Sequence, residues 1–89
     1  MKESYLEITY RHGRPLAAYY YLPRQAGQKS VRTRRVEPGL VIDYAIDGSA
    51  IGIEITAPAR LSLSTLNAVL ADVGHAPASE ADLAPLAAA

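Results

Sequence analysis

The chain has 89 residues, the size of one small domain, and it contains no cysteine, so disulfide bonds and thiolate chemistry are excluded. Its formal net charge is zero. No apolar run approaches the roughly 20 residues of a membrane span, and no signal-peptide pattern follows the first residues, which predicts a cytoplasmic protein with no membrane partner.

The charge is unevenly distributed along the chain. Residues 1–36 contain eight basic and two acidic residues, whereas residues 37–89 contain one basic and seven acidic residues. Such asymmetry can mark a nucleic-acid-binding arm. We expect instead that the two halves neutralise each other within one fold, because the basic residues lie in strand-like sequence rather than in a disordered tail.

Two alternating segments, 5–9 and 16–22, are expected to form the first strands, with a turn or short loop at 11–15. Successive strand residues point to opposite faces of a sheet. The expected inward set is Leu6, Ile8, Tyr10, Ala18, Tyr20 and Leu22, and the expected outward set is Tyr5, Glu7, Thr9, Ala17, Tyr19 and Tyr21. A polar loop at 23–30 leads to a third strand at 31–36.

Residues 40–55 are predicted to form a β-hairpin whose two alternating segments meet at Asp47-Gly48. Asp-Gly in this position favours a two-residue type I′ turn, in which both central residues have positive φ. That turn pairs Leu40 with Ile55 and Tyr44 with Ile51. It assigns Leu40, Ile42, Tyr44, Ile46, Ile51, Ile53 and Ile55 to an apolar face, and Val41, Asp43, Ala45, Ala50, Gly52 and Glu54 to the opposite face.

The connection Glu37-Pro38-Gly39 decides where the arginines of the third strand lie. A three-residue loop would set Arg34 opposite Ile42 on the apolar face, where an unpaired cation is costly. A loop of two or four residues would set Arg32 and Arg34 on the face of Asp43 and Glu54. We favour the second arrangement, because opposite charges across strands stabilise a sheet.

After the hairpin the apolar spacing changes to that of a helix, predicted over 63–74. Ser64 is the expected N-cap, and Gly74 the expected left-handed residue after the helix. Residues 79–87 are predicted to form a short second helix or tail. The predicted fold is a single α+β domain, with an antiparallel sheet of four to five strands over 5–56 and the first helix packed on one face.

The hairpin Asp43-Tyr44-x-x-Asp47-Gly48-x-x-x-Gly52-Ile53-Glu54-Ile55 resembles that of a bacterial family of small proteins, domain of unknown function 2283. The resemblance covers 5–56, with Tyr10, 17–22, Val31 and Thr33 in corresponding places. Arg11-His12-Gly13 departs from the acidic first loop of that family, as does Tyr20-Tyr21 from its aliphatic and charged residues. The resemblance implies a small β-rich fold without an established activity. It also implies an antitoxin-like role, because members are often encoded beside small toxin-like proteins.

Candidate catalytic chemistry is sparse. Asp43 and Glu54 share a face, and two nearby carboxylates can divide acid and base roles. We favour a solvated or arginine-paired sheet face, with Gly52 leaving room for Asp43 or for a neighbouring Tyr or Arg side chain. His12 and His75 lack partners at metal-ligand spacing, and no glycine-rich phosphate loop is present. We therefore expect no metal, no cofactor and no catalytic residue.

The strongest candidate site is an interface formed by Tyr19, Tyr21, Arg32, Arg34, Asp43 and Glu54. Exposed Tyr and Arg are enriched in binding hot spots. The predicted function is a non-catalytic protein-interaction module, homodimeric through the polar face or an edge. An antitoxin-like or nucleic-acid-binding regulator that uses the basic half is the alternative, and a small hydrolase with Asp43 and Glu54 is a third possibility.

Overall fold

The computed structural model describes residues 3–36 and 39–87, and it has the α+β fold expected from the sequence. Its elements are the strands β1 (Tyr5–Arg11), β2 (Arg14–Tyr21), β3 (Arg32–Val36), β4 (Leu40–Tyr44) and β5 (Ala50–Ile55), the 3-10 helix η1 (Pro58–Arg60), and the helices α1 (Leu63–Asp72) and α2 (Glu80–Ala87).

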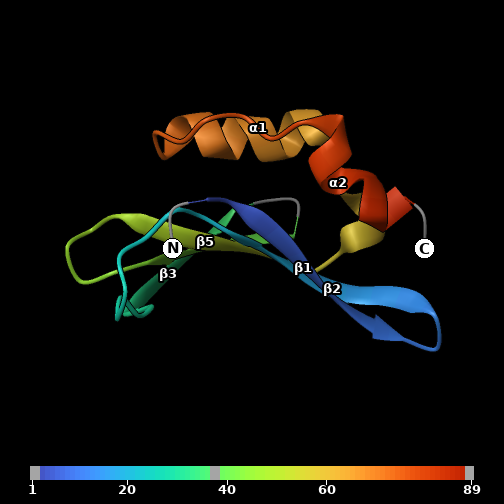
Figure 1. Cartoon of the computed structure of the whole chain (residues 1–89), viewed down its shortest axis with the longest axis horizontal. Helices are drawn as coiled ribbons and strands as arrows, with labels where there is room; N and C mark the ends of the chain where they lie inside the picture. Colours follow the sequence, from blue (N-terminus) through green and yellow to red (C-terminus); the bar gives the residue numbers. More distant parts are fainter. Residues whose placement is uncertain (1–2, 37–38, 88–89) are drawn as a thin grey trace.

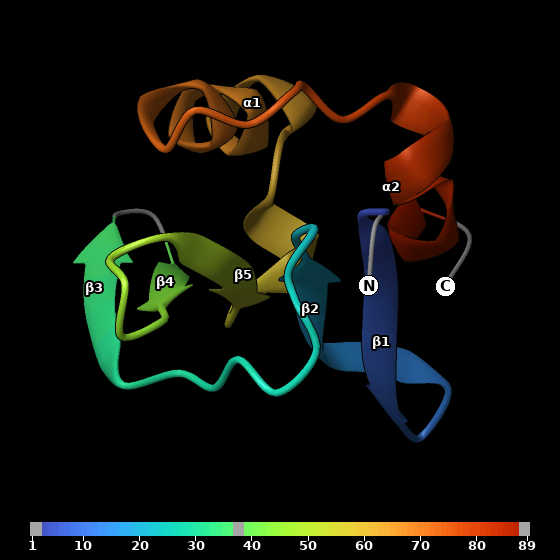
Figure 2. The same ribbon diagram turned by 60° about the vertical axis from the view of Figure 1, so that its left-hand side comes forward.

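The five strands form one antiparallel sheet in the order β1-β2-β5-β4-β3. The β1–β2 hairpin joins the β3–β4–β5 meander through the pairing of β2 with β5. Both helices lie on the same side of the sheet (Figures 1 and 2), and we call that side the helix face. The opposite side, which we call the outer face, carries Tyr5, Glu7, Tyr19, Tyr21, Thr33, Arg35, Val41, Asp43, Gly52 and Glu54.

The core lies between the helix face and α1. The helix has Leu66, Val69 and Leu70 at spacings that bring them to one side, and all three are buried. They pack with the buried side chains of the central strands, Ala18, Tyr20, Leu22, Leu40, Ile42, Tyr44, Ile53 and Ile55. Fully burying one such aliphatic side chain stabilises the fold by about 1.5–3 kcal/mol. The inward assignment of Ala18, Tyr20 and Leu22 is thus confirmed.

The caps of α1 are partly as predicted. Ser62, not Ser64, is the N-cap, because its hydroxyl accepts a hydrogen bond from the backbone N–H of Thr65 at 3.1 Å. At the other end Gly74 has the expected positive φ, 78°. The N–H of His75 donates to the carbonyl of Leu70 at 2.8 Å, as in a Schellman motif.

The segment after α1 is held by Asn67. Its side-chain amide donates to the carbonyl of Ala78 at 3.1 Å and accepts from the N–H of Ala78 at 2.7 Å. Ser79 then caps α2, since its N–H donates to the carboxylate of Asp82 at 2.8 Å while its hydroxyl accepts from the Asp82 N–H at 3.3 Å. The predicted short second helix is present over Glu80–Ala87.

A turn forms at Asp47-Gly48, but it is not the predicted two-residue type I′ turn. Gly48 has φ 89°, but Asp47 is not in the left-handed region. The loop has three residues, closed by a hydrogen bond from Ala45 N–H to Ser49 carbonyl at 2.9 Å. In this conformation Oδ1 of Asp47 accepts from both the N–H and the hydroxyl of Ser49, which stabilises the loop. Ile46 is consequently at the loop tip and 91% exposed, not on the apolar face.

The register of the hairpin is correct up to that loop. Four pairs are as predicted, namely Leu40 with Ile55, Val41 with Glu54, Ile42 with Ile53 and Asp43 with Gly52. A register shift then pairs Tyr44 with Ala50 rather than with Ile51. The extra residue of β5 absorbs the change from a two-residue to a three-residue loop.

The predicted side of Arg32 and Arg34 is wrong. Val36 pairs with Leu40, so three residues, 37–39, connect the strands, and Arg34 lies opposite Ile42 on the helix face. The turn residues Glu37 and Pro38 themselves lie outside the described residues. This register does not bury an unpaired cation. β3 is an edge strand, so its arginine side chains extend to the rim of the domain and are exposed.

Candidate functional site

The structure divides the six predicted interface residues between two surfaces. Tyr19, Tyr21, Asp43 and Glu54 lie together on the outer face, as the sequence pattern indicated. Arg32 and Arg34 instead lie on the helix face of β3. The candidate site is therefore the outer face without these two arginines, and the arginine-bearing edge is a separate surface.

The centre of the outer face is organised by Tyr19. From β2, its ring extends over Gly52 of β5, and its hydroxyl donates to Oδ2 of Asp43 on β4 at 2.6 Å. A Cβ at Gly52 would overlap the ring. The sequence signal, a glycine paired with an aspartate, predicted room for a neighbouring side chain, and the structure identifies that side chain as Tyr19. Burial, reinforced by the hydrogen bond to Asp43, raises the pKa of Tyr19 well above its ordinary range.

Three tyrosines form a continuous cluster beside this contact. The rings of Tyr5 and Tyr21 are stacked with centroids 4.5 Å apart, and Tyr19 meets Tyr21 edge-on at 4.6 Å. The Tyr21 hydroxyl donates to Glu7 at 3.2 Å, and the guanidinium of Arg24 lies 5.3 Å from the Tyr21 ring centroid. Burial and the neighbouring Glu7 raise the pKa of Tyr21. These contacts fix the rings while leaving Tyr5 47% exposed.

The charges of the outer face are ordered across the strands. The pairing registers align Glu7, Tyr19, Glu54, Val41 and Arg35 in one row from β1 to β3. Acidic side chains thus occupy β1 and β5 in this row, and a basic side chain occupies β3. Arg35 is not among the predicted interface residues, because the expected loop length placed it on the opposite face.

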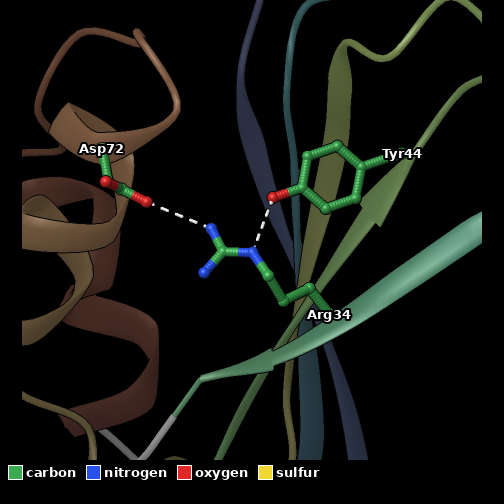
Figure 3. A network of polar contacts seen from close by, with 3 residues as sticks. All are labelled: Arg34, Tyr44 and Asp72. Atoms are coloured by element: carbon green, nitrogen blue, oxygen red, sulfur yellow. Dashed lines mark hydrogen bonds and ion pairs between the residues drawn. The ribbon is translucent and has the colours of Figure 1, made fainter.

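The second surface is the edge of the sheet at β3, where Arg34 bridges to α1 (Figure 3). Its Nε donates to the Tyr44 hydroxyl at 3.0 Å, and its Nη2 lies 3.1 Å from Oδ2 of Asp72. These two partners raise the pKa of Arg34. The guanidinium of Arg32 stacks 4.2 Å from the centroid of the Tyr44 ring. No signal in the sequence linked Asp72 to the third strand.

A hollow of about 580 Å³ lies between β3 and α1 beside this cluster. Its lining is mixed: Val36, Ala68 and Val69 are apolar, and Ser64, Arg34 and Asp72 are polar or charged. Because β3 is the last strand of the sheet, the hollow borders the free edge of the strand.

The two carboxylates considered for acid–base chemistry, Asp43 and Glu54, have different surroundings on the outer face. Asp43 accepts a hydrogen bond from the Tyr19 hydroxyl, and Glu54 is exposed. Within the ranges 3–36 and 39–87, no group of three His, Cys, Asp or Glu could hold a metal ion. His12 lies in the β1–β2 turn, and His75 closes the C-terminal cap of α1.

Comparison with known proteins yields no family model, no curated protein and no solved structure that matches the chain. The resemblance of the hairpin to domain of unknown function 2283 therefore stays a prediction. Among the helices that the structure describes, none is long and apolar enough to cross a membrane.

Proposed function

We propose that this chain is a non-catalytic protein-interaction module that forms a homodimer through the outer face. The observation that carries the proposal is the tyrosine cluster of that face, partly exposed yet held in place by Asp43, Glu7 and ring stacking. Aromatic side chains that are already ordered lose little conformational entropy when they bind. Tyrosine is also among the residues that dominate binding energy at interfaces.

A second copy of the chain is the partner that the charge order favours. A two-fold axis parallel to β5 and above it would stack two outer faces as an aligned sheet sandwich. β1 of one protomer would then lie over β3 of its partner, so that Glu7 faces Arg35 twice. Tyr19 would face Val41, which adds apolar contact near the centre.

The same charges argue against nucleic acid on this surface. Glu7, Asp43 and Glu54 lie among the tyrosines and would repel a phosphate backbone. An antitoxin-like role stays a prediction of the resemblance alone. Acid–base catalysis is less favoured, since Asp43 is occupied by the Tyr19 hydroxyl.

The experiment exchanges the charges of Glu7 and Arg35 and measures the mass of the protein particle in solution. Sedimentation or light scattering of the full chain at micromolar concentration is expected to give two chains per particle. Glu7→Arg and Arg35→Glu should each shift the mass toward one chain, and the double variant should restore the dimer. Arg60→Glu reverses a charge away from the outer face and is the matched control. A monomer at all tested concentrations, or a double variant weaker than both single variants, would overturn the proposal.

A further inference from the structure

We infer that the free edge of β3 binds an extended acidic peptide segment as a sixth strand. The inference concerns the edge of the sheet and the hollow on its helix face, and it shares Arg35 with the proposed homodimer. β3 pairs with β4 alone, so half of its backbone N–H and C=O groups point away from the sheet. An edge of this kind is a template for pairing with another strand.

The positive charge of the β3 edge favours an acidic binding partner. Three of the five residues of β3 are arginines, Arg32, Arg34 and Arg35, and the strand contains no acidic residue. An antiparallel pairing of two β3 strands would set arginine beside arginine, and like charges in that position destabilise a sheet. A second copy is therefore a poor partner here, whereas carboxylates on the incoming strand would face Arg32 and Arg35.

The hollow between β3 and α1 accepts the other side chains of the incoming strand. It has about 580 Å³, and its apolar lining is formed by Val36, Ala68 and Val69. Side chains on a sixth strand alternate between the two faces. Those on the helix face would enter the hollow opposite Val36, where Arg34 is already fixed at the rim by Tyr44 and Asp72 (Figure 3). The pattern that fits is apolar opposite Val36 and acidic opposite Arg32 and Arg35.

A peptide fits this edge better than a nucleic acid does. Single-stranded nucleic acid binds through aromatic stacking in addition to charge. The aromatic ring at this edge, Tyr44, is only 8% exposed and is covered by Arg32. Arg34 already has Asp72 as its counter-ion, so the proposed peptide places its carboxylates opposite Arg32 and Arg35 instead.

The test is a titration of the isotope-labelled chain, followed by the NMR signals of its backbone amides. The probe is an acetylated and amidated peptide, Thr-Val-Glu-Val-Thr-Glu, and its control has Lys in place of both Glu. We expect saturable shifts confined to 32–36 and 63–72 at millimolar peptide, with the Lys peptide at least about tenfold weaker. Adding salt should weaken binding of the Glu peptide.

Two variants separate the two parts of the site. Arg32→Glu should reverse the preference between the Glu and Lys peptides, and Ala68→Phe, at an exposed position of α1, should block the hollow and weaken both. Shifts outside the edge and α1, equal binding of the two peptides, or tighter binding of an oligothymidine would overturn the inference. Arg32 and the hollow lie on the helix face, so the effects of Arg32→Glu and Ala68→Phe do not depend on whether the outer face dimerises.

Discussion

The hydroxyl of Tyr19 donates a 2.6 Å hydrogen bond to Asp43 across a strand that carries only a glycine between them. Gly52 is therefore a packing requirement rather than a flexible point. The tyrosine ring occupies the volume that any larger residue on β5 would need. This arrangement joins β2, β5 and β4 on the outer face.

Gly52→Ala is expected to destabilise the fold, because the new Cβ overlaps the Tyr19 ring. The cost of such overpacking is about 1–3 kcal/mol in the free energy of unfolding, measurable by urea denaturation. In the background of Tyr19→Ala the same substitution should cost much less, since the ring is gone. Equal costs in the two backgrounds would show that the contact is not the cause.

Tyr19→Phe is expected to lower stability at neutral pH by about 1 kcal/mol, the usual contribution of one hydrogen bond. Burial and the hydrogen bond to Asp43 raise the pKa of Tyr19 in the folded state above the ordinary tyrosine value of about 10. Tyrosine in the unfolded chain therefore deprotonates first, so this stabilisation is complete below about pH 10 and is lost as the pH rises further.

The measurement for Tyr19→Phe is the urea midpoint as a function of pH. The difference between the variant and the original chain should shrink above about pH 10. Tyr5→Phe, on the same face, serves as the control. A difference that stays constant through the alkaline range would contradict the role given to the hydroxyl.

Asn67→Ala is expected to release the segment that connects the two helices. The variant loses the paired hydrogen bonds between the side-chain amide and the backbone of Ala78. An unsatisfied buried backbone group costs about 1–3 kcal/mol. Amide hydrogen exchange should accelerate over 78–87 while the rates in β4 and β5 change little. Uniform acceleration across the chain would indicate global destabilisation instead.

His12→Asn is expected to stabilise the β1–β2 hairpin. His12 and Gly13 have φ values of 52° and 76°, so the two-residue turn has positive φ at both central positions. Asparagine tolerates this conformation better than histidine, and Asn-Gly is the preferred pair. The gain should be a few tenths of a kcal/mol, measured as a higher thermal midpoint. His75→Asn is a matched control outside the turn.

The local patterns in this sequence predicted most of the fold. Alternation located the strands, the spacing of Leu66, Val69 and Leu70 located α1, and the pairs from Leu40–Ile55 to Asp43–Gly52 were correct. The turn type was not predictable from Asp-Gly alone. Asp47 stays outside the left-handed region and accepts two hydrogen bonds from Ser49.

The position of the arginines could not be predicted for a different reason. The face of Arg32 and Arg34 changes when the loop between β3 and β4 is one residue longer or shorter. The energy of charge pairing across strands is too small to decide between the two registers. What compensates Arg34 on the helix face is Asp72, 38 residues further along the chain. No local pattern contains a contact of that separation. The sequence therefore placed Tyr19, Tyr21, Asp43 and Glu54 on their correct face, and it placed Arg32 and Arg34 on the wrong one.

Glu7 and Glu54 provide the sharpest test of the proposed dimer, because the same substitution should have opposite effects at the two positions. Glu7 would face Arg35 of the other protomer, so Glu7→Gln should weaken the dimer roughly threefold. Glu54 lies on β5, under the two-fold axis, where it would meet its own copy. Glu54→Gln should therefore strengthen the dimer by a similar factor. The test compares the dimer dissociation constants of the two variants with that of the original chain, measured by sedimentation equilibrium. Glu80→Gln on α2 is the control. Two effects of the same sign would rule out this axis, even if the chain is dimeric.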